Sequence, residues 1–324
     1  MEEIKAPAFI LEDVQTDRQN QTLDEKIEES QKILRLAAEM SKTYYGEPLI
    51  LAYSGGKDSD VMLHLAESCL NVGDFEVLNG HTTVDAPETV YHIRAVFKAL
   101  NDKGVKTSID YHKLPDGTNE TMWSLIPKKK LPPTRIARYC CAVLKEATTP
   151  NRMCAVGVRA AESNGRKGRD VFGIRGKTKK DMLYYSLDHA AEVHIESQEI
   201  QDDNWDCTFI KTMKDHKDTV VNPIYEWEDS DIWDYIHREH LKVNPLYDRG
   251  YVRVGCIGCP LAGPRTRAKA FADYPKYKQL YINAFQRMID GYTEPTQWKT
   301  GEEVFEWWNG TYKREVKGQL SLFD

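Results

Sequence analysis

The sequence predicts an α/β fold, a parallel sheet with helices on both faces, followed by a helical C-terminal region. Between residues 49 and 158, short apolar runs alternate with longer amphipathic segments, which is the pattern of β–α–β units. The first apolar run ends at two glycines, where a strand turns into a helix. Residues 265–291 and 300–315 are rich in aromatic side chains and have a helical pattern.

The elements follow one another in a regular order. A helix is expected from Leu23 to Tyr45, because its apolar residues trace one face and Gly46 ends it. The elements expected next are strand 49–53, helix 59–71, strand 75–79, helix 86–103, strand 106–111, helix 138–147, strand 152–158 and helix 229–240. Asp85 is expected to be the N-cap of helix 86–103, with Pro87 in its first turn.

Composition and charge restrict the classes of function. The chain of 324 residues is 41% hydrophobic and 29% charged, as expected for a soluble globular protein. No apolar run approaches the roughly 18 residues of a membrane span, and residues 1–5 lack the basic-then-apolar layout of a signal peptide. We therefore expect a cytoplasmic protein with no membrane partner. A net charge of −6 argues against whole-surface binding of nucleic acid but permits a local basic patch.

The chain is expected to divide into four segments. They are a flexible arm (1–22), an α/β domain (23–262), a helical region (263–318) and a short tail (319–324). The domain carries an insertion at about 163–218, in which residues 166–180 hold seven basic residues and one acid among three glycines. We interpret this insertion as a mobile loop, either a solvated excursion or a contact for a polyanion such as nucleic acid.

The turn at Ser54-Gly55-Gly56-Lys57-Asp58-Ser59 predicts an anion site. Glycines between a strand and a helix let backbone N–H groups and the positive end of the helix dipole face one point. Lys57 adds a charge, Ser54 and Ser59 add hydroxyl donors, and Asp58 would repel phosphate unless it held Mg²⁺ or an amide. The spacing matches neither the Walker loop nor the dinucleotide turn.

Arg159 directly follows the strand that ends in Val156-Gly157-Val158. Because the carboxyl ends of parallel strands share one edge of the sheet, its guanidinium is expected near Lys57. Its planar fork suits phosphate or sulfate.

Four of the seven cysteines form a candidate metal site. Cys140 and Cys141 are adjacent and open a helix, while Cys256 and Cys259 form a Cys-x-x-Cys turn. Four thiolates suit a [4Fe-4S] cluster or zinc, and the adjacent pair favours the bulkier cluster. Free thiols are the remaining alternative.

Taken together, these motifs resemble the phosphoadenosine phosphosulfate (PAPS) reductase family of the PP-loop superfamily, whose fold is adenine nucleotide alpha hydrolase-like. The resemblance covers about residues 25–265. The motifs that carry it are the loop at 54–59, Pro87-Glu88-Thr89, Arg138-Tyr139-Cys140-Cys141, Gly157-Val158-Arg159, Asp231-Ile232-Trp233 and Asn244-Pro245-Leu246-Tyr247 through Cys259.

The resemblance implies two branches of enzyme. Sulfonucleotide reductases make sulfite from PAPS or adenylylsulfate with a further cysteine near the C-terminus, but no cysteine follows Cys259 here, and Cys154 or Cys207 would need another geometry. ATP-consuming sulfurtransferases, which include DNA phosphorothioation proteins, cleave ATP to AMP and pyrophosphate. We expect this second activity, with nucleic acid as acceptor.

In that enzyme, Lys57, Asp58 and Arg159 would be catalytic, with Asp58 placing Mg²⁺. The whole loop and Arg159 would bind ATP, or PAPS in a reductase.

The tail Gln319-Leu320-Ser321-Leu322-Phe323 resembles the peptide by which replication proteins bind the sliding clamp. Gln319, Leu320, Leu322 and Phe323 would be the anchors. The alternative for the tail is a strand folded back on its own domain, against Trp307 and Trp308. If the tail binds a clamp, a non-catalytic, clamp-recruited adaptor is a third interpretation of the protein.

Overall fold

The computed structural model describes residues 21–145, 152–162, 171–174 and 219–311. These residues belong to two units, one formed by residues 1–79, 88–109 and 149–254, and the other by residues 80–87, 110–148 and 255–324. The first unit contains α2 (Leu23–Met40), β1 (Leu49–Ala52), α3 (Lys57–Cys69), β2 (Phe75–Gly80), α4 (Pro87–Asp102), β3 (Thr107–Asp110), β4 (Met153–Val156), the 3₁₀ turn η3 (Ala160–Glu162), β5 (Phe172–Ile174), β6 (Thr219–Val221) and α9 (Asp229–Arg238). The second contains α5 (Met122–Lys129), α6 (Tyr139–Leu144), α10 (Pro264–Asp273), α11 (Pro275–Asp290) and α12 (Gly301–Asn309).

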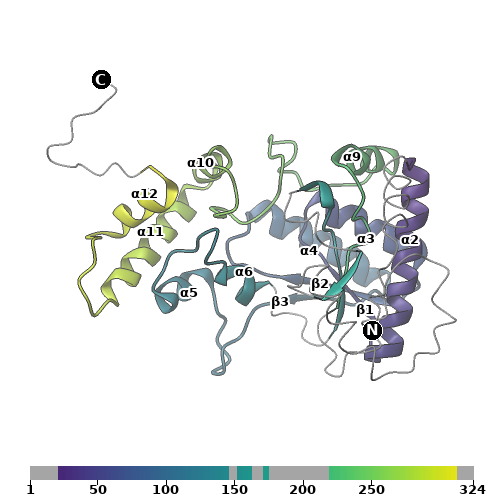
Figure 1. Ribbon diagram of the computed structural model, residues 1–324, viewed down its shortest axis with the longest axis horizontal. Coiled ribbons are helices and arrows are strands. Elements are labelled where there is room, and N and C mark those ends of the chain that lie inside the picture. Colours follow the sequence, from purple (N-terminus) through teal and green to yellow (C-terminus); the bar gives the residue numbers. More distant parts are fainter. Residues whose placement is uncertain (1–20, 146–151, 163–170, 175–218, 312–324) are drawn as a thin grey trace, which may run out of the picture. The chain divides into compact units, whose positions relative to one another are not determined.

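The first unit contains an α/β sheet whose described strands have the order β3-β2-β1-β4-β6-β5. Figure 1 labels three of these strands, β1, β2 and β3. β1 pairs in parallel with both β2 and β4, and β4 pairs in parallel with β6. The chain runs outward from β1 through β2 to β3 and then returns to place β4 on the other side of β1. The boundary between β1 and β4 is thus the point at which the strand order reverses, where α/β sheets bind ligands.

Buried apolar residues hold this unit together. β1 is buried on both faces, with Leu49 and Leu51 fully inaccessible, as expected of a central parallel strand. Val61 and Leu65 of α3 are also fully buried and belong to the same apolar cluster as Leu49 and Leu51. This burial fixes the axis of α3 relative to β1, so the loop between them has rigid supports on both sides.

α2 begins and ends at recognisable signals. Thr22 is its N-cap and forms a capping box with Glu25. After Met40 the chain makes a π-helical turn over Ser41–Tyr45, and Gly46 ends it in a left-handed conformation with φ +68°. The helix expected from Leu23 to Tyr45 is therefore confirmed, with a widened last turn.

The second unit has an aromatic core formed by α10, α11 and α12. The ring of Tyr281 lies 4.9 Å from that of Trp308, and the ring of Phe271 lies 5.0 Å from that of Phe305. Gly301 begins α12 where a Cβ would lie 2.3 Å from the carbonyl oxygen of Ile282. Only glycine permits this approach of α12 to α11.

Several expectations from the sequence need correction. β5 lies inside the segment expected to be a loop, and it pairs antiparallel with β6, so the described sheet is not wholly parallel. The helix expected over 265–291 is two helices, because Pro275 cannot continue α10. Asp85 is not an N-cap, since α4 begins at Pro87 and the Asp85 carboxylate accepts a hydrogen bond from the Thr82 amide instead.

Helix α5 was absent from the expected elements, although Thr121 caps it with its side chain. Strand β6 was also absent from the expected elements, and α12 ends at Asn309 rather than at 315, because Gly310 ends it in a left-handed conformation. The other expected strands and helices agree with the structure to within a few residues at each end, and the α/β fold with a helical C-terminal region is confirmed. The four segments predicted from the sequence stay a prediction. In the part of the chain that the structure describes, no helix is long and apolar enough to cross a membrane.

Candidate functional site

The glycine loop joins β1 to α3 and is held by its own side chains. Gly55 has φ +71°, and a Cβ on it would lie 2.9 Å from Ile93, so the position requires glycine. Ser59 in the first turn of α3 folds back, where its Oγ accepts from the Gly56 amide at 3.2 Å and from the Ser54 amide at 3.3 Å. These contacts give the loop a fixed shape at the N-terminus of α3.

A second segment clamps this loop from outside. The buried Asn244 donates from Nδ2 to the Gly55 carbonyl at 2.9 Å and to Thr89 Oγ1 at 3.0 Å. Three residues later, Tyr247 Oη accepts a 2.8 Å hydrogen bond from the Lys57 amide. Burial raises the pKa of the Tyr247 phenol, so it stays protonated. In the sequence these two residues were only part of a family motif.

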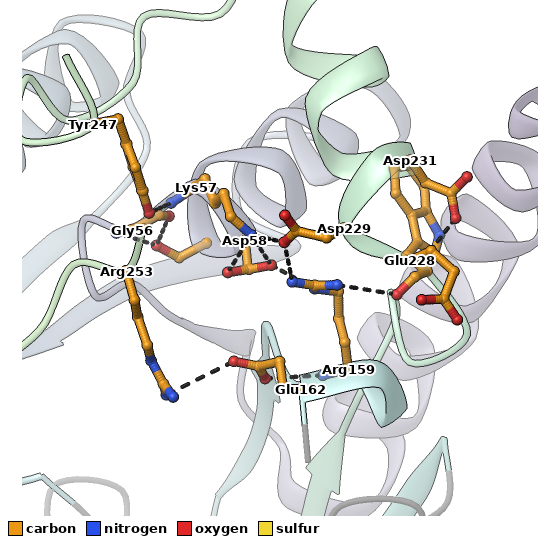
Figure 2. Close-up of polar contacts among 12 residues, drawn as sticks. Gly56, Lys57, Asp58, Arg159, Glu162, Glu228, Asp229, Asp231, Tyr247 and Arg253 are labelled. Carbon is orange, nitrogen blue, oxygen red and sulfur yellow. Dashed lines mark hydrogen bonds and ion pairs between the residues drawn. The ribbon is translucent and has the colours of Figure 1, made fainter. Parts of the chain in front are cut away.

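Two cations and two carboxylates alternate beside the loop, as Figure 2 shows. Arg159, which is 3% exposed, donates from Nε to Asp58 at 2.6 Å and from Nη2 to Asp229 at 2.9 Å. Lys57 Nζ donates to the same Asp229 oxygen at 2.6 Å and lies 3.3 Å from Asp58. The carbonyl of Trp227 accepts from Arg159 Nη1 at 3.3 Å, which uses the third side of the guanidinium fork.

The network has an electrostatic consequence for Asp229. Burial alone would raise the pKa of this carboxyl, but the hydrogen bonds and charges of Lys57 and Arg159 hold it below its usual range. Asp229 is therefore ionised at neutral pH and competes with any anionic ligand for both cations. The sequence predicted that Arg159 and Lys57 would meet, and they do; it gave no sign of Asp229, which comes from α9.

One further cation borders this group. The guanidinium of Arg253 points toward Glu162, with 3.7 Å between Nη2 and Oε1 (Figure 2). Glu162 also accepts from the backbone amide of Arg159 at 3.3 Å. Arg253 has a side chain that is 67% exposed, so it adds positive charge where solvent and ligands have access.

A buried carboxylate lies under the loop. Asp60 accepts a hydrogen bond from Tyr53 and lies 3.1 Å from Nε2 of His92, while its other oxygen has no hydrogen-bond partner. Burial raises its pKa despite these contacts. This group lies in the first turn of α3 and, like Asp229, was not indicated by the sequence.

The four cysteines all lie in the second unit. Cys140 and Cys141 begin α6, as expected, and Cys256 and Cys259 flank Gly258, which has φ +73°. The turn is held at Ile257, whose carbonyl accepts from Tyr281 Oη at 3.0 Å. Burial raises the pKa of the Tyr281 phenol, and the charges of Cys256, Cys140 and Cys259 raise it further.

The thiols differ in acidity. A hydrogen bond from Cys140 and the neighbouring Arg138 lower the pKa of Cys141. The hydrogen bond with Cys141 and burial raise the pKa of Cys140. Burial raises the pKa of Cys256 to about 12, although Lys145 opposes this. In the described residues no group of three or more His, Cys, Asp or Glu side chains is arranged to hold a metal ion. The donor set itself, four soft thiols with Arg138 and Lys145 nearby, has the chemistry that a metal–sulfur group would require of its ligands.

Three predicted features lie outside the described residues: the basic run 166–180 except for residues 171–174, Cys207, and the tail 319–324. Cys154 is described and is 1% exposed inside β4. It is therefore not an accessible nucleophile in this fold.

The fold and the loop define this chain as an α/β protein with an anion site between a strand and a helix, at the switch point of a mainly parallel sheet. The sequence profile of the phosphoadenosine phosphosulfate reductase domain matches residues 48–262. The chain belongs to this family, within the PP-loop superfamily.

Relatives support an enzyme at the level of the family without specifying the reaction. Adenosine 5'-phosphosulfate reductase 1 of Bacillus subtilis is 39% identical over 217 residues, covering 67% of this chain and 75% of that protein. An uncharacterized protein of Methanocaldococcus jannaschii is 24% identical over 274 residues, which cover 84% of this chain and 54% of that protein. A second from the same organism is 25% identical over 252 residues, 78% of this chain and 44% of that one. The chain thus spans about half the length of these two relatives.

The solved structures that resemble this chain have low TM-scores and low sequence identity. PAPS reductase from Candida auris in its phosphate complex has a TM-score of 0.42 at 15% identity, covering 79% of this chain and 98% of that chain. The U34-tRNA thiolase NcsA from Methanococcus maripaludis with its [4Fe-4S] cluster has a TM-score of 0.38 at 13% identity, covering 90% of this chain and 85% of that chain. Neither likeness carries an argument about the site.

The close packing at Gly157 gives a first prediction. A Cβ at this position would lie 3.1 Å from the carbonyl carbon and oxygen of Asp58, so Gly157→Ala must push the first turn of α3 away from the end of β4. We expect a loss of roughly 1–3 kcal/mol in the free energy of unfolding, measured with urea. Gly255→Ala, where a Cβ meets nothing within 4 Å, is the matched control. Equal stability of the two variants would contradict the packing described here.

The acidity of Cys141 gives a second prediction. In metal-free protein at about pH 7, iodoacetamide should modify Cys141 before Cys140 and Cys256, because only the thiolate reacts. The reaction of Cys141 should slow when the pH falls below the pKa of this thiol, because the thiolate is then protonated. The variant Arg138→Gln should slow the reaction of Cys141 at constant pH, because it removes a charge that favours the thiolate. Mass spectrometry of the peptides measures the order, with buried Cys154 as an internal unreactive control. Earlier modification of Cys256 would refute the assignment.

Proposed function

We propose that this chain cleaves ATP between its α and β phosphates, releasing pyrophosphate, and uses the adenylated intermediate for sulfur transfer onto nucleic acid. The observation that carries the proposal is that two cations, Lys57 and Arg159, lie beside the glycine loop and contact the same carboxylate, Asp58. A loop of this kind receives the pyrophosphate part of a nucleotide, and the two cations stabilise the charge that develops on the leaving group.

The carboxylates have a role in the same reaction. Asp58 and Asp229 both offer hard oxygen ligands beside the two cations, and such ligands suit Mg²⁺, which would neutralise charge on the phosphates. In the reaction, an acceptor oxygen forms a bond to the α-phosphorus, and the bond to the bridging oxygen breaks. The electron pair leaves with pyrophosphate. A sulfur donor then replaces AMP on the acceptor.

The cysteines would hold a [4Fe-4S] cluster through Cys140, Cys141, Cys256 and Cys259. Such a cluster supplies electron transfer or an iron site for a sulfur ligand. The support is the chemistry of the donor set: four thiols in one unit, with Lys145 and Arg138 close enough to favour thiolates. Zinc is less well supported, because no three of the described side chains are arranged around a single ion.

A nucleic-acid acceptor is supported by charge in the second unit. Residues 121–145 contain six basic residues and no acid, and residues 255–272 contain three basic residues and no acid, in a chain of net charge −6. Lys129, Lys130 and Arg135 are exposed. Arg135 donates from Nε to the Pro260 carbonyl at 3.2 Å, so the two basic stretches adjoin each other. A local positive surface of this kind attracts a phosphate backbone.

A sulfonucleotide reductase is the second candidate, favoured by the identity to adenosine 5'-phosphosulfate reductase 1 of Bacillus subtilis. Against it, residues 260–324 contain no cysteine and Cys154 is buried. The clamp-binding tail at 319–324 also stays a proposal, and a clamp-recruited adaptor without turnover is the alternative that it would suit.

Products distinguish the candidates. With MgATP and a sulfide donor under anaerobic conditions, we expect AMP and pyrophosphate, and we expect no sulfite from PAPS or adenylylsulfate with a thiol reductant. Arg159→Lys should lower pyrophosphate release about 100-fold or more, because a lysine cannot replace a fork that contacts two carboxylates. The control is Arg94→Lys on the exposed side of α4. Sulfite formation without ATP turnover would establish the reductase, and binding without any product would establish the adaptor.

Salt dependence tests the acceptor. Binding of single-stranded RNA and of duplex DNA is measured against salt concentration for wild type and for the double variant Lys129→Gln, Lys130→Gln. Loss of two phosphate contacts should make the slope of log K against log salt shallower by about 1 to 2. The double variant Arg94→Gln, Lys98→Gln on α4 removes the same charge elsewhere and should leave the slope unchanged. An equal change in both variants would exclude a local binding surface.

A further inference from the structure

Arg267 in α10 is a half-buried cation that has one buried hydrogen-bond donor without a partner. Its Nη2 donates to the carbonyl of Trp308 at 3.0 Å, and its Cζ lies 4.2 Å from the centre of a Trp308 ring. Its Nε–H is also buried but has no hydrogen-bond partner. A buried donor without an acceptor costs roughly 1–3 kcal/mol, and more on a charged group. Such a group needs an explanation.

The guanidinium cannot easily turn away, because Trp308 is itself fixed. Its indole N–H donates to the Pro133 carbonyl at 2.5 Å. Its ring packs 4.9 Å from Tyr281 and 5.4 Å from Phe285. Arg267 is therefore held against a rigid aromatic surface, and the direction of its Nε–H is set by packing.

The face of α10 that carries Arg267 covers the Cys256–Cys259 turn. Phe271 lies one helical turn after Arg267 and so shares its face. A Cβ on Gly258 would lie 2.6 Å from Phe271, which places this face directly on the turn. Among the charges that act on Arg267 is that of Cys259. The unused donor thus belongs to the surroundings of the cysteines.

We propose that Arg267 is a positioning residue for the metal–sulfur group held by the four cysteines, donating its Nε–H to a sulfur of that group and offsetting its negative charge. This inference rests on the cofactor in the proposed function. The described side chains supply no acceptor for the Nε–H, whereas sulfur atoms bound to iron are acceptors. A hydrogen bond and a positive charge at sulfur both favour the reduced state, so they raise the reduction potential.

The test compares three variants after anaerobic reconstitution with iron and sulfide. Arg267→Gln removes the charge and the Nε–H, and Arg267→Lys keeps the charge but has no Nε–H. Arg265→Gln is the matched control, since Arg265 lies two residues earlier in α10 and is exposed. The readouts are iron and sulfide content, the rate of iron loss to a chelator and the midpoint potential. Circular dichroism of each metal-free variant checks its fold.

We expect Arg267→Gln to lose iron about 10-fold faster than wild type and to have a more negative midpoint potential. Arg267→Lys should be intermediate, and Arg265→Gln should equal wild type. Identical retention and potential in all four loaded proteins would overturn the role of Arg267. If wild type takes up no iron and sulfide, the cofactor assignment and this inference both fail, while pyrophosphate release from ATP still tests the nucleotide reaction separately.

Discussion

The parallel pairing of β1 with β4 is the constraint on which the nucleotide site depends. Ala52 and Val156 are partners in this register, so the glycine loop and the segment leading to Arg159 leave the sheet side by side. Gly157 allows the end of β4 to approach Asp58 to a distance at which no other side chain fits comfortably. Because the apolar cores of β1 and α3 fix the loop from behind, this single junction brings Lys57, Asp58 and Arg159 together.

The charges at this junction are balanced by the protein itself. Each cation contacts both carboxylates, and the Arg159 side chain is only 4% exposed, which would be costly without partners. The two carboxylates are not equivalent, since the Asp229 side chain is 64% exposed and that of Asp58 is 22% exposed. An arriving phosphate can therefore replace Asp229, which water can solvate, more easily than Asp58. Asp229 thus holds Lys57 and Arg159 in position and can be replaced by a phosphate when the nucleotide binds.

The local parts of the fold and site could be predicted from the sequence, and the long-range parts could not. Gly55 and Gly56 predict a tight turn, because two glycines between a strand and a helix usually mark one. The location of Arg159 near Lys57 is predicted by the rule that the carboxyl ends of parallel strands lie at one edge of the sheet. Asp229, Asn244 and Tyr247 reach the loop from segments more than 150 residues away, and no periodicity signals such contacts. β5 was missed because three residues beside an irregular basic stretch carry no alternation.

The most direct test is the structure of this protein bound to Mg²⁺ and the α,β-methylene analogue of ATP, which cannot be cleaved at that bond. The account predicts that the β and γ phosphates lie on the loop at 54–59, and that Arg159 Nη2 and Lys57 Nζ contact phosphate oxygens in place of Asp229. Asp58 should keep its contact with Arg159 Nε. A nucleotide bound elsewhere, or bound with the bonds of Lys57 and Arg159 to Asp229 unbroken, would contradict it.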